Sequence, residues 1–211
     1  MNRFVPVLEK VIQFSLLTFA LSSLFSISIT QLSFGIGSLS WLLKTHLTRT
    51  WSEIRGTRVG IAILAFCLAY IISLTTAVDL ESGINFIKKL LQVVIFFWVA
   101  NTVQDEKQRN ILVSLVIFAA VASALNGIFL NYASLAQDSR GFYLGMYGGR
   151  PVGTMSVPST FSGLLMIAGL IALGKSLFNK PKNYWVFGGF GIIALCLMIV
   201  QARQAWLGFI L

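Results

Sequence analysis

Residues 111–130 read ILVSLVIFAAVASALNGIFL, an apolar run without a charged side chain. A helix needs roughly 20 apolar residues to cross the hydrocarbon core of a bilayer, and this run has that length. Polar residues stand on both sides of it, with Arg109 and Asn110 before it and Asn131 after it. The run therefore predicts a membrane-spanning helix, and similar runs elsewhere in the chain extend this prediction to the whole protein.

Four further runs predict spans of the same kind, namely residues 59–78, 86–103, 159–174 and 184–200. Residues 205–211 begin another apolar run, in which the sequence stops. A natural C-terminus seldom falls part-way into a span, so we expect residues 1–211 to be a single multi-span membrane domain that is truncated at its C-terminus.

The first apolar stretch, residues 11–43, is too long for one ordinary span and short for two. Polar residues and glycines gather near its middle: Ser28, Thr30, Gln31, Ser33, Gly35 and Gly37. These residues favour a tight hairpin of two short or tilted helices, and the alternative is one long tilted helix. With the hairpin, we expect an all-α polytopic protein of about seven transmembrane helices plus the start of an eighth.

The composition excludes several classes of protein. Hydrophobic residues make up 56% of the 211 residues and charged residues 11%, whereas soluble proteins have about 25% charged residues. Mean hydropathy is +0.82. Cys67 and Cys196 each lie inside an apolar run without a CxxC spacing, which argues against a disulfide framework or a metal site. We therefore do not expect a water-soluble enzyme or a protein with a nucleic-acid partner. We also expect no bound metal and no cofactor.

The sixteen basic residues predict the orientation, because cytoplasmic loops are enriched in Lys and Arg. With residues 11–43 as a hairpin, eleven of them lie on the side of the N-terminus and five on the other side. A single first helix would reverse this bias in every later loop. We therefore favour the hairpin, a cytoplasmic N-terminus, and an outward position for the loop of residues 131–158.

The five outward basic residues are Lys88, Lys89, Arg140, Arg150 and Arg203. Arg150 lies in a segment rich in glycine and proline that leads into a span, where a guanidinium group and free backbone N–H groups together can bind an anion. Arg203 stands between two apolar runs with almost no loop around it, which favours a functional role. Lys88 and Lys89 are possible accessory residues. Contact of these side chains with lipid headgroups is the competing interpretation.

The chain offers no catalytic residues of its own that we could identify. His46 is the single histidine and falls in a basic segment expected to be a cytoplasmic loop, without Cys, Asp or His at ligand spacing. The acidic residues lie in expected loops or at span ends, which weakens the case for a proton-coupled transporter. A hydrolytic triad and a metal centre are therefore not predicted.

Two segments resemble the O-antigen ligase and O-antigen polymerase family of bacterial membrane glycosyltransferases. They are RPVGTMSVP at residues 150–158 and QARQAWLG at residues 201–208, separated by a span, a short basic loop and another span. The resemblance covers essentially the whole chain. It implies a multi-pass, metal-independent enzyme of the bacterial inner membrane that works on the periplasmic face.

The resemblance also implies substrates and roles. The donor would be an undecaprenyl-diphosphate-linked glycan, and the acceptor the lipid A core in a ligase or another glycan in a polymerase. Arg150 and Arg203 match the family positions that hold the carrier diphosphate. The family's catalytic histidine belongs to a later periplasmic segment with no counterpart in these 211 residues, and His46 lies in the wrong part of the chain to replace it.

The sequence leaves two other hypotheses about the function open. A transporter or flippase-like protein could use the same outward arginines to bind an anionic lipid or metabolite without catalysis. A structural membrane subunit would need neither arginine. Further sequence with a large outward loop and a histidine would favour the transferase, and an inverted repeat of the spans would favour transport.

Overall fold

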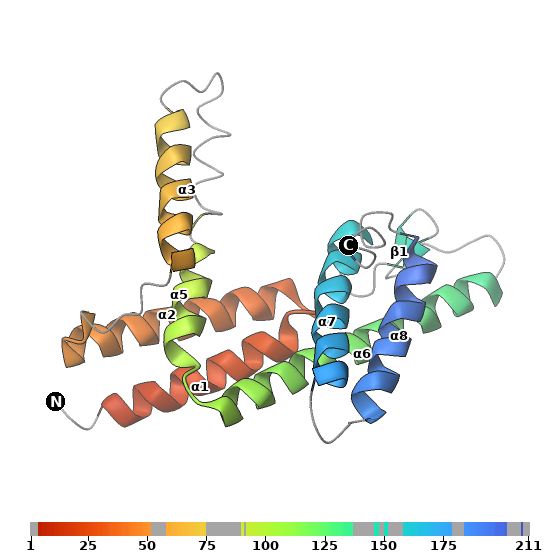
Figure 1. Ribbon diagram of the computed structural model, residues 1–211, viewed down its shortest axis with the longest axis horizontal. Helices are drawn as coiled ribbons and strands as arrows, with labels where there is room; N and C mark the ends of the chain where they lie inside the picture. The colour runs from red at the N-terminus through yellow and green to blue at the C-terminus, as the bar shows by residue number, and fades with distance from the viewer. Residues whose placement is uncertain are drawn as a thin grey trace. The chain divides into compact units, whose positions relative to one another are not determined.

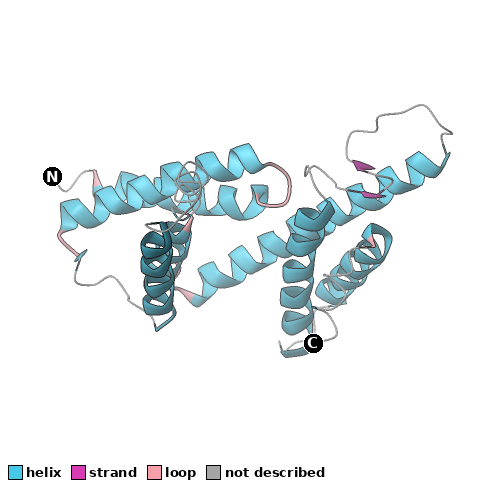
Figure 2. Cartoon of the chain, turned by 90° about the horizontal axis from the view of Figure 1, so that it is seen from above, coloured by secondary structure: helices cyan, strands magenta, loops and turns pink. Residues whose placement is uncertain are grey.

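The computed structural model describes residues 4–51, 58–74, 90, 92–136, 146–147, 150–151, 158–178, 184–201 and 208. Within these residues helices, joined by short turns, form all of the regular secondary structure except one pair of two-residue strands (Figures 1 and 2). The all-α expectation therefore holds for the described part of the chain, with this small hairpin as the exception. The chain divides into two compact units, residues 1–16 with 33–108 and residues 17–32 with 109–211.

Three of the described helices are long and apolar enough to cross a membrane: Val5–Ser22, Glu106–Phe129 and Pro158–Phe178. Three further apolar helices are shorter, namely Val59–Leu74, Val93–Thr102 and Tyr184–Val200. Seven spans were expected, so the described residues supply fewer than the sequence predicted. The helix Tyr184–Val200 has 17 residues and is therefore about 25 Å long, which is less than the roughly 30 Å thickness of the hydrocarbon core. The helices Val59–Leu74 and Val93–Thr102 are shorter still, so these three helices fall short of a full span because of their length.

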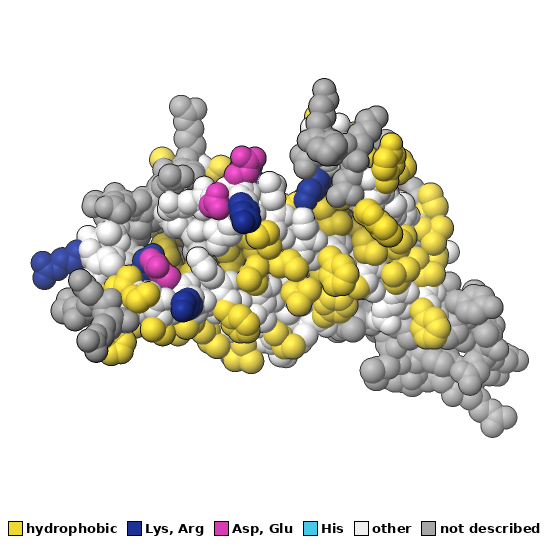
Figure 3. Space-filling view, turned by 90° about the horizontal axis from the view of Figure 1, so that it is seen from below, with side chains coloured by type: hydrophobic (Ala, Val, Ile, Leu, Met, Phe, Trp, Pro, Cys, Tyr) yellow, Lys and Arg dark blue, Asp and Glu magenta, His cyan; other side chains and the backbone are white. Residues whose placement is uncertain are grey.

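Large apolar side chains lie on the surface of these helices (Figure 3). Phe14 is 72% exposed, Phe118 is 64% exposed and Trp185 is 90% exposed. Water-soluble monomers rarely carry so much contiguous exposed apolar surface. The exposed apolar residues and the three long helices together indicate a membrane protein.

The first apolar stretch forms two helices, α1 (Val5–Ser22) and α2 (Ile27–Thr48). The turn between them lies at residues 23–26, where the N–H of Ser26 donates to the carbonyl of Ser22 (2.9 Å). The hairpin is therefore present, but the turn was expected further along, around residues 28–37. His46 was expected in a loop and instead lies in the last turn of α2.

Local hydrogen bonds explain why the polar residues of α2 do not break the helix. The hydroxyl of Thr30 donates to the carbonyl of Ser26 (2.7 Å), and the hydroxyl of Ser38 donates to the carbonyl of Gly35 (3.3 Å). Each hydroxyl is thereby satisfied by its own helix. For this reason Thr30 and Ser38 lie within α2 and do not form the turn between α1 and α2.

In the first unit, α2 packs against α5 (Val93–Thr102). Trp98 is completely buried, and its ring lies 6.2 Å from that of Phe34. A Cβ atom at Gly37 would overlap the indole of Trp98. Gly37 is thus the residue that lets the backbone of α2 approach Trp98. The same unit contains α3 (Arg58–Leu74), which was expected as a span over residues 59–78.

In the second unit, the core lies between α6 (Glu106–Ala136), α7 (Pro158–Phe178) and α8 (Tyr184–Val200). Phe161, Leu165 and Ile193 are fully buried there. Small residues line the contacts between the helices, as is usual when helices pack in a membrane.

The glycines of α8 differ in their surroundings. A Cβ atom at Gly189 would lie 3.0 Å from Val121 on α6, whereas Gly188 and Gly191 have open space around them. Gly163 on α7 likewise has nothing within 4 Å. Of these four glycines, only Gly189 therefore serves close helix packing.

The observed bounds can be compared with the predicted spans. α8 has the bounds that the sequence predicted, residues 184–200. α7 and α6 extend beyond their predicted spans, and the end of α6 includes residues 131–136, which were expected to begin the outward loop. The expected loop of residues 131–158 therefore begins only after α6 ends at Ala136. The loop contains the strand pair β1 (Met146–Tyr147) and β2 (Arg150–Pro151).

Candidate functional site

Arg150, the first residue of the predicted diphosphate site, begins strand β2. Its backbone pairs with that of Tyr147 in antiparallel register, which leaves the two residues Gly148 and Gly149 as the connection. Arg150 is therefore the first residue of the returning strand.

Strand β2 contacts α8 within the second unit. Figure 1 draws the strand pair beside the end of α8 where Val200 leads into residue 201. Arg203 follows only three residues after Val200 in the sequence. The strand that carries Arg150 thus lies against the helix that leads directly to Arg203.

Gln201, the residue directly after α8, has a left-handed backbone (φ 53°). A left-handed residue is a common way to end a helix, although a side chain makes it less favourable than glycine there. The N–H of Gln201 donates to the carbonyl of Met198 (3.2 Å). The helix therefore stops directly before the QARQAWLG motif, where the predicted span of residues 184–200 also ended.

The last residue of that motif lies against α7. A Cβ atom at Gly208 would overlap the sulfur of Met166. The chain before Arg203 and the chain after it therefore both contact elements of the second unit. Arg203, Lys88 and Lys89 themselves lie outside the described residues, and only the backbone of Arg150 is described.

A second candidate site, which the sequence did not predict, is a pocket of about 540 Å³ in the first unit. It lies between the start of α1, the end of α2, the end of α5 and the turn into α6. Its wall carries four threonines, Thr45, Thr48, Thr50 and Thr102. It also carries four side-chain amides, from Gln13, Asn101, Gln104 and Gln108. This lining is unusually polar, because ligand pockets are lined predominantly by apolar residues.

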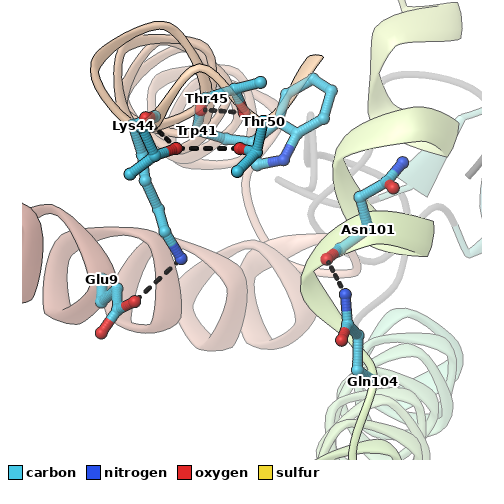
Figure 4. A network of polar contacts seen from close by, with 8 residues as sticks. Glu9, Trp41, Lys44, Thr45, Thr50, Asn101 and Gln104 are labelled. Atoms are coloured by element: carbon cyan, nitrogen blue, oxygen red, sulfur yellow. Dashed lines mark hydrogen bonds and ion pairs between the residues drawn. The ribbon is translucent and has the colours of Figure 1, made fainter. Parts of the chain in front are cut away.

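Three charged residues complete the pocket, Glu9, Lys44 and Asp105. The ammonium group of Lys44 lies 2.9 Å from the carboxylate of Glu9 (Figure 4). The carboxylate of Asp105 accepts a hydrogen bond from the N–H of Lys107 (3.4 Å), as an N-cap residue of α6 does. The pocket therefore contains one ion pair and one further carboxylate.

Charge bias had already assigned the segments around this pocket to one side of the membrane. The eleven basic residues on the side of the N-terminus lie in residues 1–10, 44–58, 104–110 and 175–183, and the first three of these segments contribute to the pocket wall. The sequence could not reveal the pocket, because its residues come from distant segments that each look like an ordinary polar loop or span end. The one available signal was a cluster of threonines at the end of an apolar run, at Thr45, Thr48 and Thr50.

The chain was also compared with known proteins. No family model, no curated protein and no solved structure matches it.

Proposed function

We propose that the chain is the carrier-binding part of a membrane glycosyltransferase of the O-antigen ligase type. It would bind an undecaprenyl-diphosphate-linked glycan at the periplasmic face of the bacterial inner membrane. The acceptor would be the lipid A core or another glycan. The proposal includes seven spans, the start of an eighth, and a cytoplasmic N-terminus.

One observation carries the proposal most directly. The strand that begins with Arg150 contacts α8, the helix whose last residue, Val200, stands three residues before Arg203 in the sequence. Two segments that resemble the same family in sequence are thus associated through neighbouring elements of one unit. This contact supports a shared site for the two arginines.

The membrane setting also supports the proposal. Three described helices are long and apolar enough to span a bilayer. Phosphate groups of a lipid carrier lie at the membrane surface, where a guanidinium group can make two parallel hydrogen bonds to phosphate oxygens. An arginine at the edge of a span therefore suits a diphosphate carrier better than it suits a neutral lipid.

The chemistry assigns a specific task to the arginines. The acceptor hydroxyl attacks the anomeric carbon of the donor, and the bond between that carbon and the diphosphate oxygen breaks. The electron pair of the broken bond stays on the diphosphate, and the hydroxyl proton passes to a base. Arg150 and Arg203 would stabilise the negative charge that develops on the departing diphosphate. They do not act as the base in this proposal.

Arg150→Ala and Arg203→Ala test this assignment in bacterial cells that express the protein. We expect each substitution to lower surface glycan attachment by about a hundredfold, the usual effect of losing one group that stabilises developing charge. Arg140→Ala is the matched control, because it removes the same charge from the same expected loop. Immunoblots of the membrane fraction check that all variants insert equally.

The outcomes of this experiment separate the alternatives. Wild-type glycan levels in both arginine variants would contradict the site and would favour a structural subunit. A transporter would give a different result, because substitutions in it would leave the donor glycan on the cytoplasmic side. In a transferase they leave the donor intact on the periplasmic side.

A further inference from the structure

The pocket of the first unit has a charge opposite to that of the chain. The chain has sixteen basic and seven acidic residues and a net charge of +9. The pocket wall contains two of those acidic residues, Glu9 and Asp105, and a single basic residue, Lys44. Lys44 is paired with Glu9. Asp105 is therefore the carboxylate that leaves the pocket wall with a net negative charge.

The hydrogen bonds of the pocket leave mainly acceptors for a ligand. The hydroxyl of Thr45 donates to the carbonyl of Trp41 (2.9 Å), and that of Thr48 donates to the carbonyl of Lys44 (2.8 Å). The hydroxyls of Thr48 and Thr50 lie 2.8 Å apart, so Thr50 donates to Thr48. These three threonine protons are thus used within the protein, while their oxygen atoms keep lone pairs.

The amide groups follow the same pattern. The NH₂ group of Asn101 donates to the carbonyl of Phe97 (2.8 Å), and that of Gln104 donates to the carbonyl of Asn101 (3.1 Å) (Figure 4). Each amide nitrogen therefore already has one partner in its own backbone. The excess of carboxylate, amide and hydroxyl oxygens over unused donors favours a ligand that donates hydrogen bonds.

Thr102 adds an unused polar group to this wall. Its hydroxyl oxygen is buried and has no hydrogen-bond partner. Within the described residues, this hydroxyl therefore differs from those of Thr45, Thr48 and Thr50, which all take part in hydrogen bonds of the protein. Helix dipoles do not decide the charge of that group, because two helix N-termini and two C-termini border the pocket.

We propose that this pocket binds a primary ammonium group, carried either by the headgroup of phosphatidylethanolamine or by a small soluble amine. A primary ammonium group has a positive charge, three donors and no acceptor, which matches a negative wall rich in acceptors. A phosphate alone fits poorly, because the single lysine is already paired. The site is separate from the proposed diphosphate site, and it uses residues of the first unit only.

The expected orientation supports a lipid source. The charged residues of the wall come from segments assigned to the cytoplasmic side, next to the ends of apolar helices. Lipid headgroups occupy that depth of a membrane. A lipid amine could therefore enter the pocket without leaving the membrane surface.

The test measures lipid retention by native mass spectrometry of the purified chain in detergent. Phosphatidylethanolamine, phosphatidylcholine and phosphatidylglycerol are offered separately. Phosphatidylcholine has a positive charge without N–H donors, and phosphatidylglycerol has hydroxyl groups without an amine. Calorimetry with ethanolamine alone then distinguishes a soluble amine from a lipid headgroup as the source.

Three variants make the test specific. Asp105→Asn removes the charge and retains the helix cap, because asparagine caps a helix as well as aspartate does. Thr102→Val removes the buried hydroxyl at almost constant volume. Glu106→Gln is the control, because it removes an equal charge from the next residue, which is not part of the pocket wall. Circular dichroism checks the helix content of each variant.

We expect phosphatidylethanolamine to be retained over both other lipids, with affinity about tenfold lower in Asp105→Asn and about threefold lower in Thr102→Val. Glu106→Gln should bind as the wild type does. Binding of ethanolamine alone would identify a soluble amine, and its absence would identify the lipid. Equal retention of phosphatidylcholine, preference for phosphatidylglycerol, or equal losses in Asp105→Asn and Glu106→Gln would each overturn the proposal.

Discussion

At the scale of single residues, Gly37 controls how closely two helices approach. Trp98 is fully buried, and its indole occupies the position that a Cβ atom at Gly37 would need. Gly35, two residues earlier in the same helix, has nothing within 4 Å of such an atom. The two glycines therefore have the same backbone setting and different neighbours.

This difference predicts opposite effects of the same substitution. Gly37→Ala should destabilise the protein by about 1–3 kcal/mol, because the added methyl group displaces the indole from a packed site. Gly35→Ala should leave stability unchanged or raise it by up to about 1 kcal/mol, because alanine favours a helix. Thermal unfolding in detergent measures both variants. A shift in the same direction for both would show that Trp98 does not restrict Gly37.

At the scale of elements, α6 carries two serines with different tasks. The hydroxyl of Ser123 is buried and donates to the carbonyl of Leu24 in the turn between α1 and α2 (3.1 Å). Ser114 is exposed and accepts a hydrogen bond from the ammonium group of Lys175 on α7 (2.7 Å). Both contacts join elements of the second unit, but only the first is shielded.

Ser123→Ala should therefore cost about 1 kcal/mol, the usual net contribution of an intramolecular hydrogen bond. Ser114→Ala should change the free energy of unfolding by less than about 0.5 kcal/mol, because water can replace its partner. Chemical denaturation in mixed micelles compares the two variants. Equal effects would contradict the distinction between the buried and the exposed contact.

The elements also show what the sequence could predict. The bounds of α8 were predictable because polar residues stand on both sides of an unbroken apolar run. The turn between α1 and α2 was misplaced because hydroxyls such as that of Thr30 bond within their own helix. Gly37 resembled a helix breaker for a similar reason, since its contact with Trp98 lies about sixty residues away in the sequence.

The two candidate sites also differ in how far the sequence could predict them. The sequence displayed the two motifs of the predicted diphosphate site, but it predicted neither the strand pair nor the contact of β2 with α8. The pocket with Glu9 and Asp105 depends on contacts between segments far apart in the chain, and no local pattern encodes them.

At the scale of the whole molecule, the proposed orientation makes a prediction about access from the two sides of the membrane. Cysteine should be introduced at position 140 or 180 in a background that lacks Cys67 and Cys196. In intact spheroplasts, a membrane-impermeant maleimide should label position 140, which the positive-inside rule places outside. Position 180 should react only after the membrane is permeabilised. The reverse pattern would overturn the orientation and the hairpin-based count of spans.

Binding of the carrier to the purified 211-residue chain tests the central claim most directly. Radiolabelled undecaprenyl diphosphate should bind the wild type and the Arg140→Gln control, and undecaprenol, which lacks the diphosphate, should not compete. Arg150→Gln and Arg203→Gln should each weaken binding by at least about tenfold, because each removes charge-assisted hydrogen bonds to the diphosphate. Wild-type affinity in both arginine variants, or effective competition by undecaprenol, would contradict a diphosphate site at these residues.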